Sequence, residues 1–401
     1  MIKKKIIFVI DSLNCAGAEK SLTTLLNLID YSKYFVDLQL FSYGGEFEKL
    51  LPKEVNLLKP LKYTSFCDLD IKSAIVYSIK NCNYNMLLSR INFSFTLRKK
   101  KYSNKEKARI FWQKVSNVIQ NNENEYDIAI SYAQGIPTFY VADKIKAKNK
   151  YAWVNTSYKL NELERNFQKK YYLNYNKIIT VSHSAKEIFS DVFPEFLNKI
   201  EIIYDINDYS FINKMALIED DDLKEFKNFD GIKILTLGRL ASGKRYDRAI
   251  KACKKLVEKG IYFRWYALGI GPLEEEIKRL IIEKNLEDYF ILLGVKANPY
   301  PYIKNCDIYV QTSDFEGFGL AIAEARMLNK PVVVTRFDSV YNQMINEKNG
   351  LVVDMSSDGV AEGIYRLLND NKLRSEIIKY ISNEKKGNIE ELDKFYKLIE
   401  S

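Results

Sequence analysis

Two glutamates eight positions apart, Glu316 and Glu324, flank a glycine-containing block that follows a short apolar run. Residues Leu320–Met327, directly after Gly319, include strong helix formers and no helix breaker. A helix that begins there would direct its unpaired N–H groups and its positive dipole end at an anion. Glu316 would lie ahead of this helix and Glu324 about one turn inside it, so the two carboxylates would reach different hydroxyls of one ligand. A surface helix with two solvated acids is the alternative, but it leaves the glycine spacing unexplained.

Basic residues in another loop complement these acids. Gly238, Arg239 and Lys244 come directly after the apolar run Ile232–Leu237. A glycine at the end of a strand lets the backbone approach a ligand closely, and guanidinium and ammonium groups bind phosphate oxygens. Two cations around one tight loop can neutralise a diphosphate without a metal. A surface turn with incidental positive charge is the alternative interpretation.

The first half of the chain contains weaker candidates for functional residues. Gly17 opens a predicted helix and would present backbone amides to a phosphate or a sugar. No G-x-G-x-x-G pattern surrounds it, so a dinucleotide cofactor is not predicted. The single histidine, His183, lies between Ser182 and Ser184, either of which would cap the next helix. No G-x-S-x-G motif flanks His183, so a helix cap is favoured over a nucleophile and its base.

Ten short apolar runs position these residues. Each has five to seven residues, many of them β-branched, which is typical of strands buried on both faces of a parallel sheet. Helical patterns follow most runs, so the sequence predicts an α/β, doubly wound architecture. The runs are Lys5–Ile10, Val36–Phe41, Tyr126–Tyr132, Lys150–Val154, Lys177–Val181, Ile232–Leu237, Tyr262–Leu268, Tyr289–Leu293, Asp307–Gln311 and Pro331–Thr335.

The alternation of strands and helices restarts near residue 230, after a polar, acidic stretch. A chain of 401 residues also favours two domains. We predict a first domain over residues 1–205, a second over 206–385, and a C-terminal helix over 386–401. This last helix packs either on its own domain or back on the first one.

An insertion in the first domain, about residues 65–115, departs from the alternation. It is rich in Tyr, Phe, Asn and Lys, and apolar residues such as Leu88 and Phe95 precede four basic residues, Arg98–Lys101. One interpretation is contact with an anionic membrane surface, to which each basic residue adds about 1 kcal/mol. The other is a helical insertion with a solvated charged face.

Composition excludes several classes of protein. The formal net charge is +9, but the basic residues are dispersed and no recognition motif occurs, so no nucleic-acid partner is predicted. No segment approaches the roughly 18–20 uninterrupted apolar residues of a membrane span. The five cysteines are scattered without a C-x-x-C pair, which argues against disulfides and a zinc site and fits a reducing cytosol.

Together these motifs resemble the family-4 retaining glycosyltransferases of GT-B fold, in which two Rossmann-like, doubly wound parallel-sheet domains face a cleft. The resemblance spans nearly the whole chain and is strongest in residues 230–360. It rests on Gly17-Ala18-Glu19, Gly238-Arg239-Leu240 with Lys244, Gly269-Ile270-Gly271-Pro272, and the Glu316/Glu324 pair.

The resemblance implies a role for each matching position. Arg239 and Lys244 would clamp the donor diphosphate, Glu324 would hold the ribose, and Glu316 would face the transferred sugar. Backbone groups would complete the donor site at Gly17, Val295, Phe318, Gly319 and Leu320. One candidate catalytic position departs from the family pattern, because Asn155 stands where many relatives carry a histidine. Asparagine can donate a hydrogen bond but cannot transfer a proton near neutral pH.

The implied function is transfer of a hexose or N-acetylhexosamine from a nucleotide-diphosphate sugar, with UDP favoured, to a glycan acceptor. The family suggests a lipid-linked acceptor in the synthesis of a surface polysaccharide, such as a capsule or exopolysaccharide. It further implies no cofactor and no metal, and a cytoplasmic protein at the inner face of the plasma membrane. One alternative is a non-catalytic GT-B partner subunit, which Asn155 motivates. Another is an epimerase or hydrolase, which would need further acids and bases.

Overall fold

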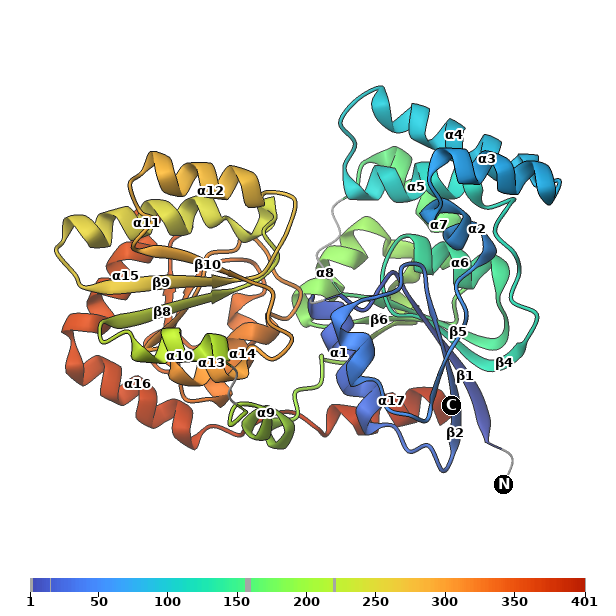
Figure 1. The fold of residues 1–401 in the computed structure, drawn as a ribbon. Coiled ribbons are helices and arrows are strands. Elements are labelled where there is room, and N and C mark those ends of the chain that lie inside the picture. Colours follow the sequence, from blue (N-terminus) through green and yellow to red (C-terminus); the bar gives the residue numbers. More distant parts are fainter. Residues whose placement is uncertain (1–2, 15, 156–159, 219–220, 401) are drawn as a thin grey trace. The chain divides into compact units, whose positions relative to one another are not determined.

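The computed structural model describes residues 3–14, 16–155, 160–218 and 221–400. These residues form two compact units, each built around its own parallel sheet (Figure 1). Among them, residues 3–14, 18–203 and 395–400 belong to the first unit, and the second is built mainly from residues 204–394. The predicted pair of doubly wound α/β domains is confirmed.

The first sheet has seven parallel strands in the order β3-β2-β1-β4-β5-β6-β7. Successive side chains of its first strand point to opposite faces, as the pleat requires. Ile7 and Val9 pack into a core with the helices of one face, whereas Phe8 lies on the other face. The strands are β1 (Lys4–Ile10), β2 (Tyr34–Leu40), β3 (Val55–Leu57), β4 (Glu125–Ser131), β5 (Lys146–Val154), β6 (Lys177–Thr180) and β7 (Ile200–Ile202).

Most helices of the first unit cover one face of this sheet. Buried aromatic residues from several of them, including Phe66, Trp112, Phe139 and Phe189, share one core with β1. The predicted insertion is helical throughout most of its length, from α2 to α5. The helices are α1 (Gly17–Leu28), α2 (Lys62–Asp68), α3 (Ile71–Lys80), α4 (Tyr84–Arg98), α5 (Asn104–Val115), α6 (Ile136–Lys144), α7 (Glu162–Tyr172) and α8 (His183–Val192).

The last helix, α17 (Glu391–Glu400), ends against the first unit. The ring of Phe395 lies 6.2 Å from that of Phe8, and Tyr396 stacks on Tyr34 with 5.9 Å between ring centroids. The Tyr151 hydroxyl donates to the Leu398 carbonyl over 3.0 Å. These contacts cover the face of the sheet that carries Phe8.

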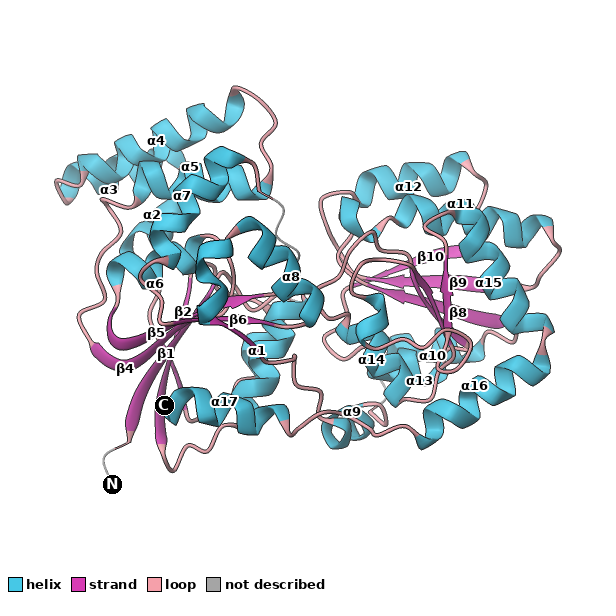
Figure 2. Cartoon of the chain, turned by 180° about the vertical axis from the view of Figure 1, so that it is seen from behind, coloured by secondary structure: helices cyan, strands magenta, loops and turns pink. Residues whose placement is uncertain are grey.

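The second sheet has six parallel strands in the order β10-β9-β8-β11-β12-β13. Helices α11, α12 and α15 cover one face, and α10, α13 and α14 the other (Figures 1 and 2). The strands are β8 (Ile232–Leu237), β9 (Phe263–Leu268), β10 (Phe290–Gly294), β11 (Ile308–Gln311), β12 (Val332–Thr335) and β13 (Leu351–Val353). The helices are α9 (Tyr209–Met215), α10 (Asp221–Asn228), α11 (Tyr246–Glu258), α12 (Glu274–Glu283), α13 (Tyr300–Asn305), α14 (Leu320–Met327), α15 (Ser357–Asn369) and α16 (Asn371–Asn383).

The strand order reverses once in each sheet, between β1 and β4 in the first and between β8 and β11 in the second. In open parallel sheets, ligands bind outside the carboxyl ends of the strands at such a reversal. The loop after β8 contains Arg239 and Lys244, and the loop after β11 contains Glu316. Glu324 lies on α14, the helix that follows the second of these loops.

Replacing Phe395 with Ala should lower the free energy of unfolding of the first unit by about 3–5 kcal/mol, because removal of a fully buried ring leaves a cavity. Urea denaturation followed by hydrogen exchange of the β1 amides measures this loss. Lys397→Ala, at an exposed position of the same helix, is the control and should change stability by less than about 0.5 kcal/mol. Equal stability of the two variants would contradict the packing described.

Candidate functional site

The basic loop after β8 is supported by the glycine turn after β9. The Leu240 N–H donates to the Ile270 carbonyl over 3.0 Å. A Cβ atom on Gly269 would lie 2.1 Å from the Gly238 carbonyl oxygen, and one on Gly271 would lie 2.3 Å from that of Leu240. Only glycine allows so close an approach, so the Gly-Ile-Gly-Pro turn fixes the course of the basic loop.

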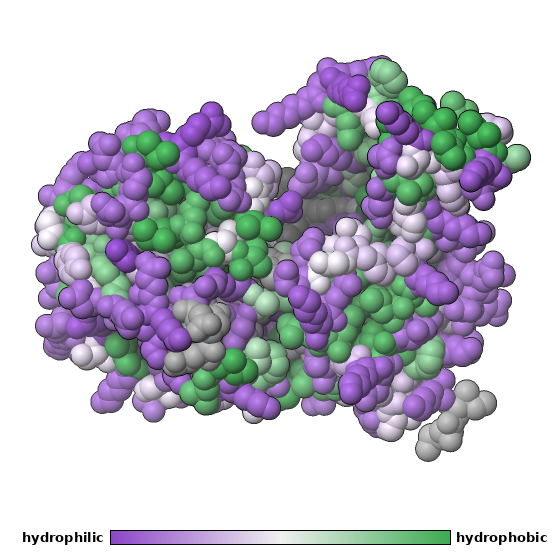
Figure 3. Space-filling model, viewed as in Figure 1, coloured by the Kyte–Doolittle hydropathy of each residue, from purple (hydrophilic) through white to green (hydrophobic). Residues whose placement is uncertain are grey.

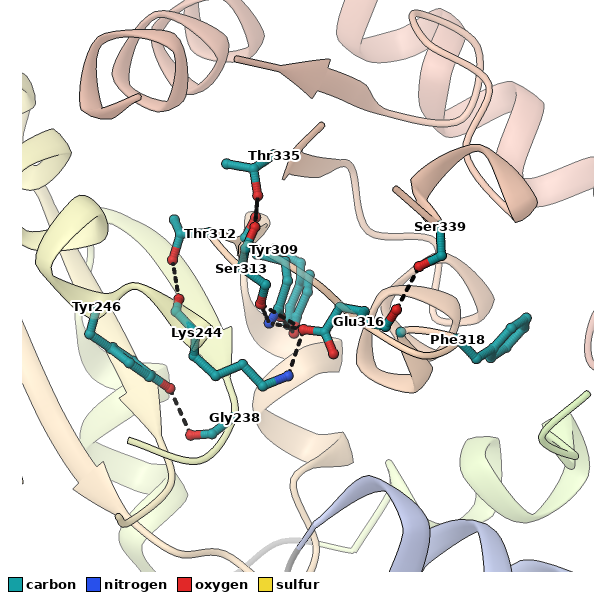
Figure 4. Close-up of polar contacts among 12 residues, drawn as sticks. Gly238, Lys244, Tyr246, Tyr309, Thr312, Ser313, Glu316, Phe318, Thr335 and Ser339 are labelled. Atoms are coloured by element: carbon teal, nitrogen blue, oxygen red, sulfur yellow. Dashed lines mark hydrogen bonds and ion pairs between the residues drawn. The ribbon is translucent and has the colours of Figure 1, made fainter. Parts of the chain in front are cut away.

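An ion pair joins this loop to the loop after β11 (Figure 4). Lys244 Nζ lies 2.5 Å from Oε1 of Glu316. The same oxygen accepts hydrogen bonds from Gln311 Nε2 over 2.9 Å and from the Ser313 hydroxyl over 2.6 Å. The second carboxylate oxygen points away from these donors in Figure 4. Glu316 is thus held in one orientation and keeps an oxygen with which to accept a ligand hydroxyl.

A further layer of side chains holds these donors in place. The Tyr309 hydroxyl donates to Gln311 Oε1 over 2.6 Å, and the Thr335 hydroxyl donates to the Ser313 carbonyl over 2.6 Å. Sequence reasoning missed Tyr309, Gln311 and Ser313. They occupy every second position along β11 and the residues that follow it, so their side chains lie on one face. This polar alternation with a period of two is the sequence pattern that could have predicted them.

The helix α14 begins where the glycine spacing predicts. Gly319 adopts φ 84° and precedes the first helical residue, Leu320. The Ser339 hydroxyl donates to the Glu316 carbonyl over 2.7 Å, and Gln343 donates to the carbonyls of Phe318 and Gly319. These bonds fix the loop ahead of the helix. The first N–H groups of α14 lack partners within the helix, which makes this end suited to an anion.

Glu324 lies in the fifth position of α14 and is only 1% exposed. The hydroxyl of Tyr300 lies 3.4 Å from its Oε1. Burial and the charge of Glu324 raise the pKa of the Tyr300 hydroxyl well above its ordinary value. A surface helix with two solvated acids is therefore the wrong interpretation, because Glu324 is an interior carboxylate.

Two further predicted residues lie at the same edge of the sheet. Arg239 lies two residues after the end of β8, is exposed, and forms no ion pair with any residue that the structure describes. Val295 follows the end of β10, where Gly294 adopts φ 68°. The structure brings Lys244 and Glu316 into contact. Arg239 and Val295 lie at the same edge because each comes after the carboxyl end of its strand.

A cluster of charges beside the basic loop was not predicted. Arg245 adopts φ 52° and pairs with Asp247 over 2.9 Å and with Asp314 over 3.0 Å. The Arg248 guanidinium lies 2.8 Å from Asp314 and donates to the Thr312 carbonyl over 2.6 Å. The hydrogen bonds that Arg245 donates to Asp247 and Asp314 raise the pKa of the Arg245 guanidinium. This cluster ties the loops after β8 and β11 together a second time.

In the first unit, Asn155 follows the end of β5. Its Nδ2 donates to the Tyr132 carbonyl over 2.6 Å, and its backbone N–H donates to Gln134 Oε1 over 3.2 Å. The buried Oδ1 has no hydrogen-bond partner among the residues described. Asn155 thus retains an acceptor at the carboxyl edge of the sheet.

Gly17 is the first residue of α1, and His183 is the first residue of α8. The Ser182 hydroxyl accepts from the Ala185 N–H over 3.1 Å, so the prediction that a serine beside His183 caps this helix is confirmed, and the serine is Ser182.

Asp11, at the end of β1, is a titratable group that sequence reasoning missed. Burial and, to a smaller degree, the charge of Glu19 raise the pKa of Asp11 to about 7. A carboxyl group that titrates near neutral pH can exchange a proton at this edge of the first sheet.

Within the described ranges, no three His, Cys, Asp or Glu side chains gather closely enough to hold a metal ion. None of the helices in those ranges combines the length and the apolar character needed to cross a membrane.

The second unit matches a known family. Residues 218–384, which contain the Lys244–Glu316 pair, match the model of glycosyl transferases group 1. Anabaena HepE, solved in complex with UDP and glucose, is similar over 99% of both chains, with 15% identity and a TM-score of 0.73. The fold is that of the GT-B glycosyltransferases.

Curated relatives match part of the chain. The N-acetylgalactosamine-N,N'-diacetylbacillosaminyl-diphospho-undecaprenol 4-alpha-N-acetylgalactosaminyltransferase of Campylobacter jejuni is 33% identical over 198 residues, 49% of this chain and 50% of that protein. The poly(ribitol-phosphate) alpha-N-acetylglucosaminyltransferase of Staphylococcus aureus is 30% identical over 155 residues, 37% of this chain and 31% of that protein. The chain spans at most half the length of these two relatives.

The raised pKa of Asp11 predicts a pH dependence of stability. Between pH 4 and pH 7 the folded state holds a proton that the unfolded state, with a pKa near 3.9, has released. This contribution to the free energy of unfolding therefore falls as pH rises through that window. Asp11→Asn should remove the decline, so the variant should gain up to a few kcal/mol on the wild type at pH 8 and little at pH 4.

Urea titrations from pH 4 to pH 8, again followed by hydrogen exchange of the β1 amides, measure this difference. Glu123→Gln, at an exposed position of the same unit, is the control and should leave the wild-type pH dependence unchanged. If the free energy of unfolding of Asp11→Asn instead changed with pH in parallel with that of the wild type, the Asp11 carboxyl would have an ordinary pKa.

Proposed function

We propose that this protein is a retaining glycosyltransferase that moves a hexose or an N-acetylhexosamine from a nucleotide-diphosphate sugar to a glycan acceptor. The observation that carries the proposal is the Glu316 carboxylate, which Lys244, Gln311 and Ser313 orient at the strand-order reversal of the second unit. The match of residues 218–384 to glycosyl transferases group 1 supports the same class of reaction.

Each residue of the donor site has a distinct task in this proposal. Arg239 and Lys244 neutralise the diphosphate, and Lys244 can do so while paired with Glu316 because an ammonium group has three N–H donors. Glu316 accepts a hydroxyl of the transferred sugar, and the buried Glu324 accepts the ribose hydroxyls. The N–H groups at the start of α14, from Gly319 onward, bind phosphate oxygens.

Catalysis in this proposal is mainly positioning and electrostatic stabilisation. The acceptor oxygen forms a bond to the anomeric carbon on the face from which the diphosphate departs, and the bond from that carbon to the phosphate oxygen breaks. The departing diphosphate takes the proton of the acceptor hydroxyl. Asn155 does not transfer a proton in this scheme, so its replacement of a histidine is compatible with turnover.

The relatives support a more specific donor and acceptor. The Campylobacter jejuni relative is named for transfer to a diphospho-undecaprenol glycan, and Anabaena HepE was solved with UDP and glucose. We infer a UDP-sugar donor and a lipid-linked acceptor in the synthesis of a cell-surface polysaccharide. A lipid-linked acceptor would place the reaction at the inner face of the plasma membrane.

Incubation of the protein with a panel of UDP- and GDP-sugars should release the nucleotide slowly without an acceptor and faster with one. Glu316→Gln should lower kcat by about 100-fold to 1000-fold, because it removes charge aimed at the reacting sugar. Arg239→Ala should lower kcat/KM by roughly 10-fold to 100-fold through the loss of a charged hydrogen bond to phosphate.

Arg279→Ala, at an exposed position on α12, is the matched control and should leave both parameters unchanged. The non-catalytic alternative predicts donor binding without any nucleotide release. Release that an acceptor does not accelerate would instead indicate a hydrolase. Absence of binding to every sugar nucleotide at millimolar concentration would overturn the proposal.

We further propose that Arg239 and Lys244 neutralise the diphosphate without a divalent metal. Excess EDTA should therefore leave the initial rate of nucleotide release unchanged, and added Mg²⁺ or Mn²⁺ should raise it less than twofold. A rate that EDTA abolishes and Mn²⁺ restores would contradict this assignment of the two cations.

A further inference from the structure

Helices α3 and α4 of the first unit expose a continuous set of large apolar side chains. On α4 these positions are spaced by four, three and four residues, which places them on one face of the helix. On α3 most are spaced by four. We call this set the α3–α4 face; its residues are between 36% and 62% exposed, and they are Ile71, Ile75, Val76, Ile79, Tyr84, Leu88, Ile91 and Phe95.

The packing of α4 against its own unit uses other positions. Leu87 and Phe93 pack against the core of the first unit. Arg90 donates to the carbonyls of Phe66 and Leu69 over 3.1 Å and 2.8 Å. The helix therefore has two apolar sides, of which the unit covers only one.

Figure 3 shows these apolar side chains gathered over α3 and α4. Single exposed apolar residues are common, but a contiguous exposed patch marks a surface that binds something.

The charge of this segment identifies the chemistry of the partner. Residues 71–101 contain seven Lys and Arg residues and no Asp or Glu. Four of the seven form the run Arg98–Lys101, which begins at the last residue of α4 and is exposed. The guanidinium of Arg98 lies 5.9 Å from the Phe95 ring, so cationic and apolar groups adjoin. An anionic bilayer offers both a hydrocarbon boundary for the apolar residues and phosphates for the cations.

We propose that the α3–α4 face binds an anionic lipid bilayer, with its apolar side chains among the headgroups and Arg98–Lys101 on the lipid phosphates. The charge argues against a second copy of this chain as the occupant. A symmetric dimer places the same surface on both subunits, so two cationic segments without a single acid would meet. The proposal depends on this surface alone and not on the transferase activity.

Sedimentation of the full chain with vesicles tests the proposal. The wild type should sediment with vesicles of phosphatidylcholine and phosphatidylglycerol at 3:1 and much less with phosphatidylcholine alone. Four Gln substitutions at Arg98–Lys101 should weaken partitioning several hundredfold, since each basic residue strengthens binding to an anionic surface about fivefold. Leu88→Ser with Phe95→Ser should weaken it at least tenfold, with unchanged nucleotide release in solution.

Matched controls carry the same changes at exposed positions elsewhere. The apolar control is Leu163→Ser with Leu173→Ser, and the charge control is Gln at Lys53, Lys59, Lys372 and Lys379. Both should bind vesicles like the wild type.

Three results would overturn the proposal. One is a wild type that does not sediment with anionic vesicles, and another is binding that neither set of α3–α4 substitutions weakens. The third is a dimer in size-exclusion chromatography that Leu88→Ser with Phe95→Ser converts to a monomer without loss of vesicle binding, which would identify a second copy as the occupant.

Discussion

The reversal of strand order in each parallel sheet is the constraint from which the candidate site follows. In the second unit β8 and β11 are neighbours, but the helices that follow them, α11 and α14, cover opposite faces of the sheet. The two connecting loops therefore diverge and leave the sheet edge between them uncovered by a helix. Lys244 and Glu316 come from these two loops, and their 2.5 Å contact joins them across this edge.

A carboxylate that leaves water needs donors to replace its hydration. At Glu316 three neighbouring side chains supply them, and these donors are themselves anchored, as the Tyr309–Gln311 bond shows. All three donors bond to the same oxygen of Glu316. The carboxylate is therefore oriented, and its other oxygen can accept a ligand hydroxyl. The site is thus preorganised, which reduces the reorganisation that a reaction would otherwise require.

The sequence predicted ten strands, and each lies on a strand of the structure. The strands that it missed, β3, β7 and β13, have three residues each and lie at sheet edges, where so short an apolar run carries little signal. Lys244 and Glu316 were predicted singly from their loops. Their direct contact, and the support from Gln311 and Ser313, depend on how two loops 72 residues apart pack, which local patterns do not encode.

The C-terminal helix has a consequence for biosynthesis. Residues 395–400 pack on β1, which precedes the whole second unit in the chain. On the face of the first sheet that carries Phe8, the part that Phe395 covers therefore stays exposed while the second unit is translated. Until α17 has been synthesised, the nascent chain carries this exposed apolar surface, and surface of this kind favours aggregation.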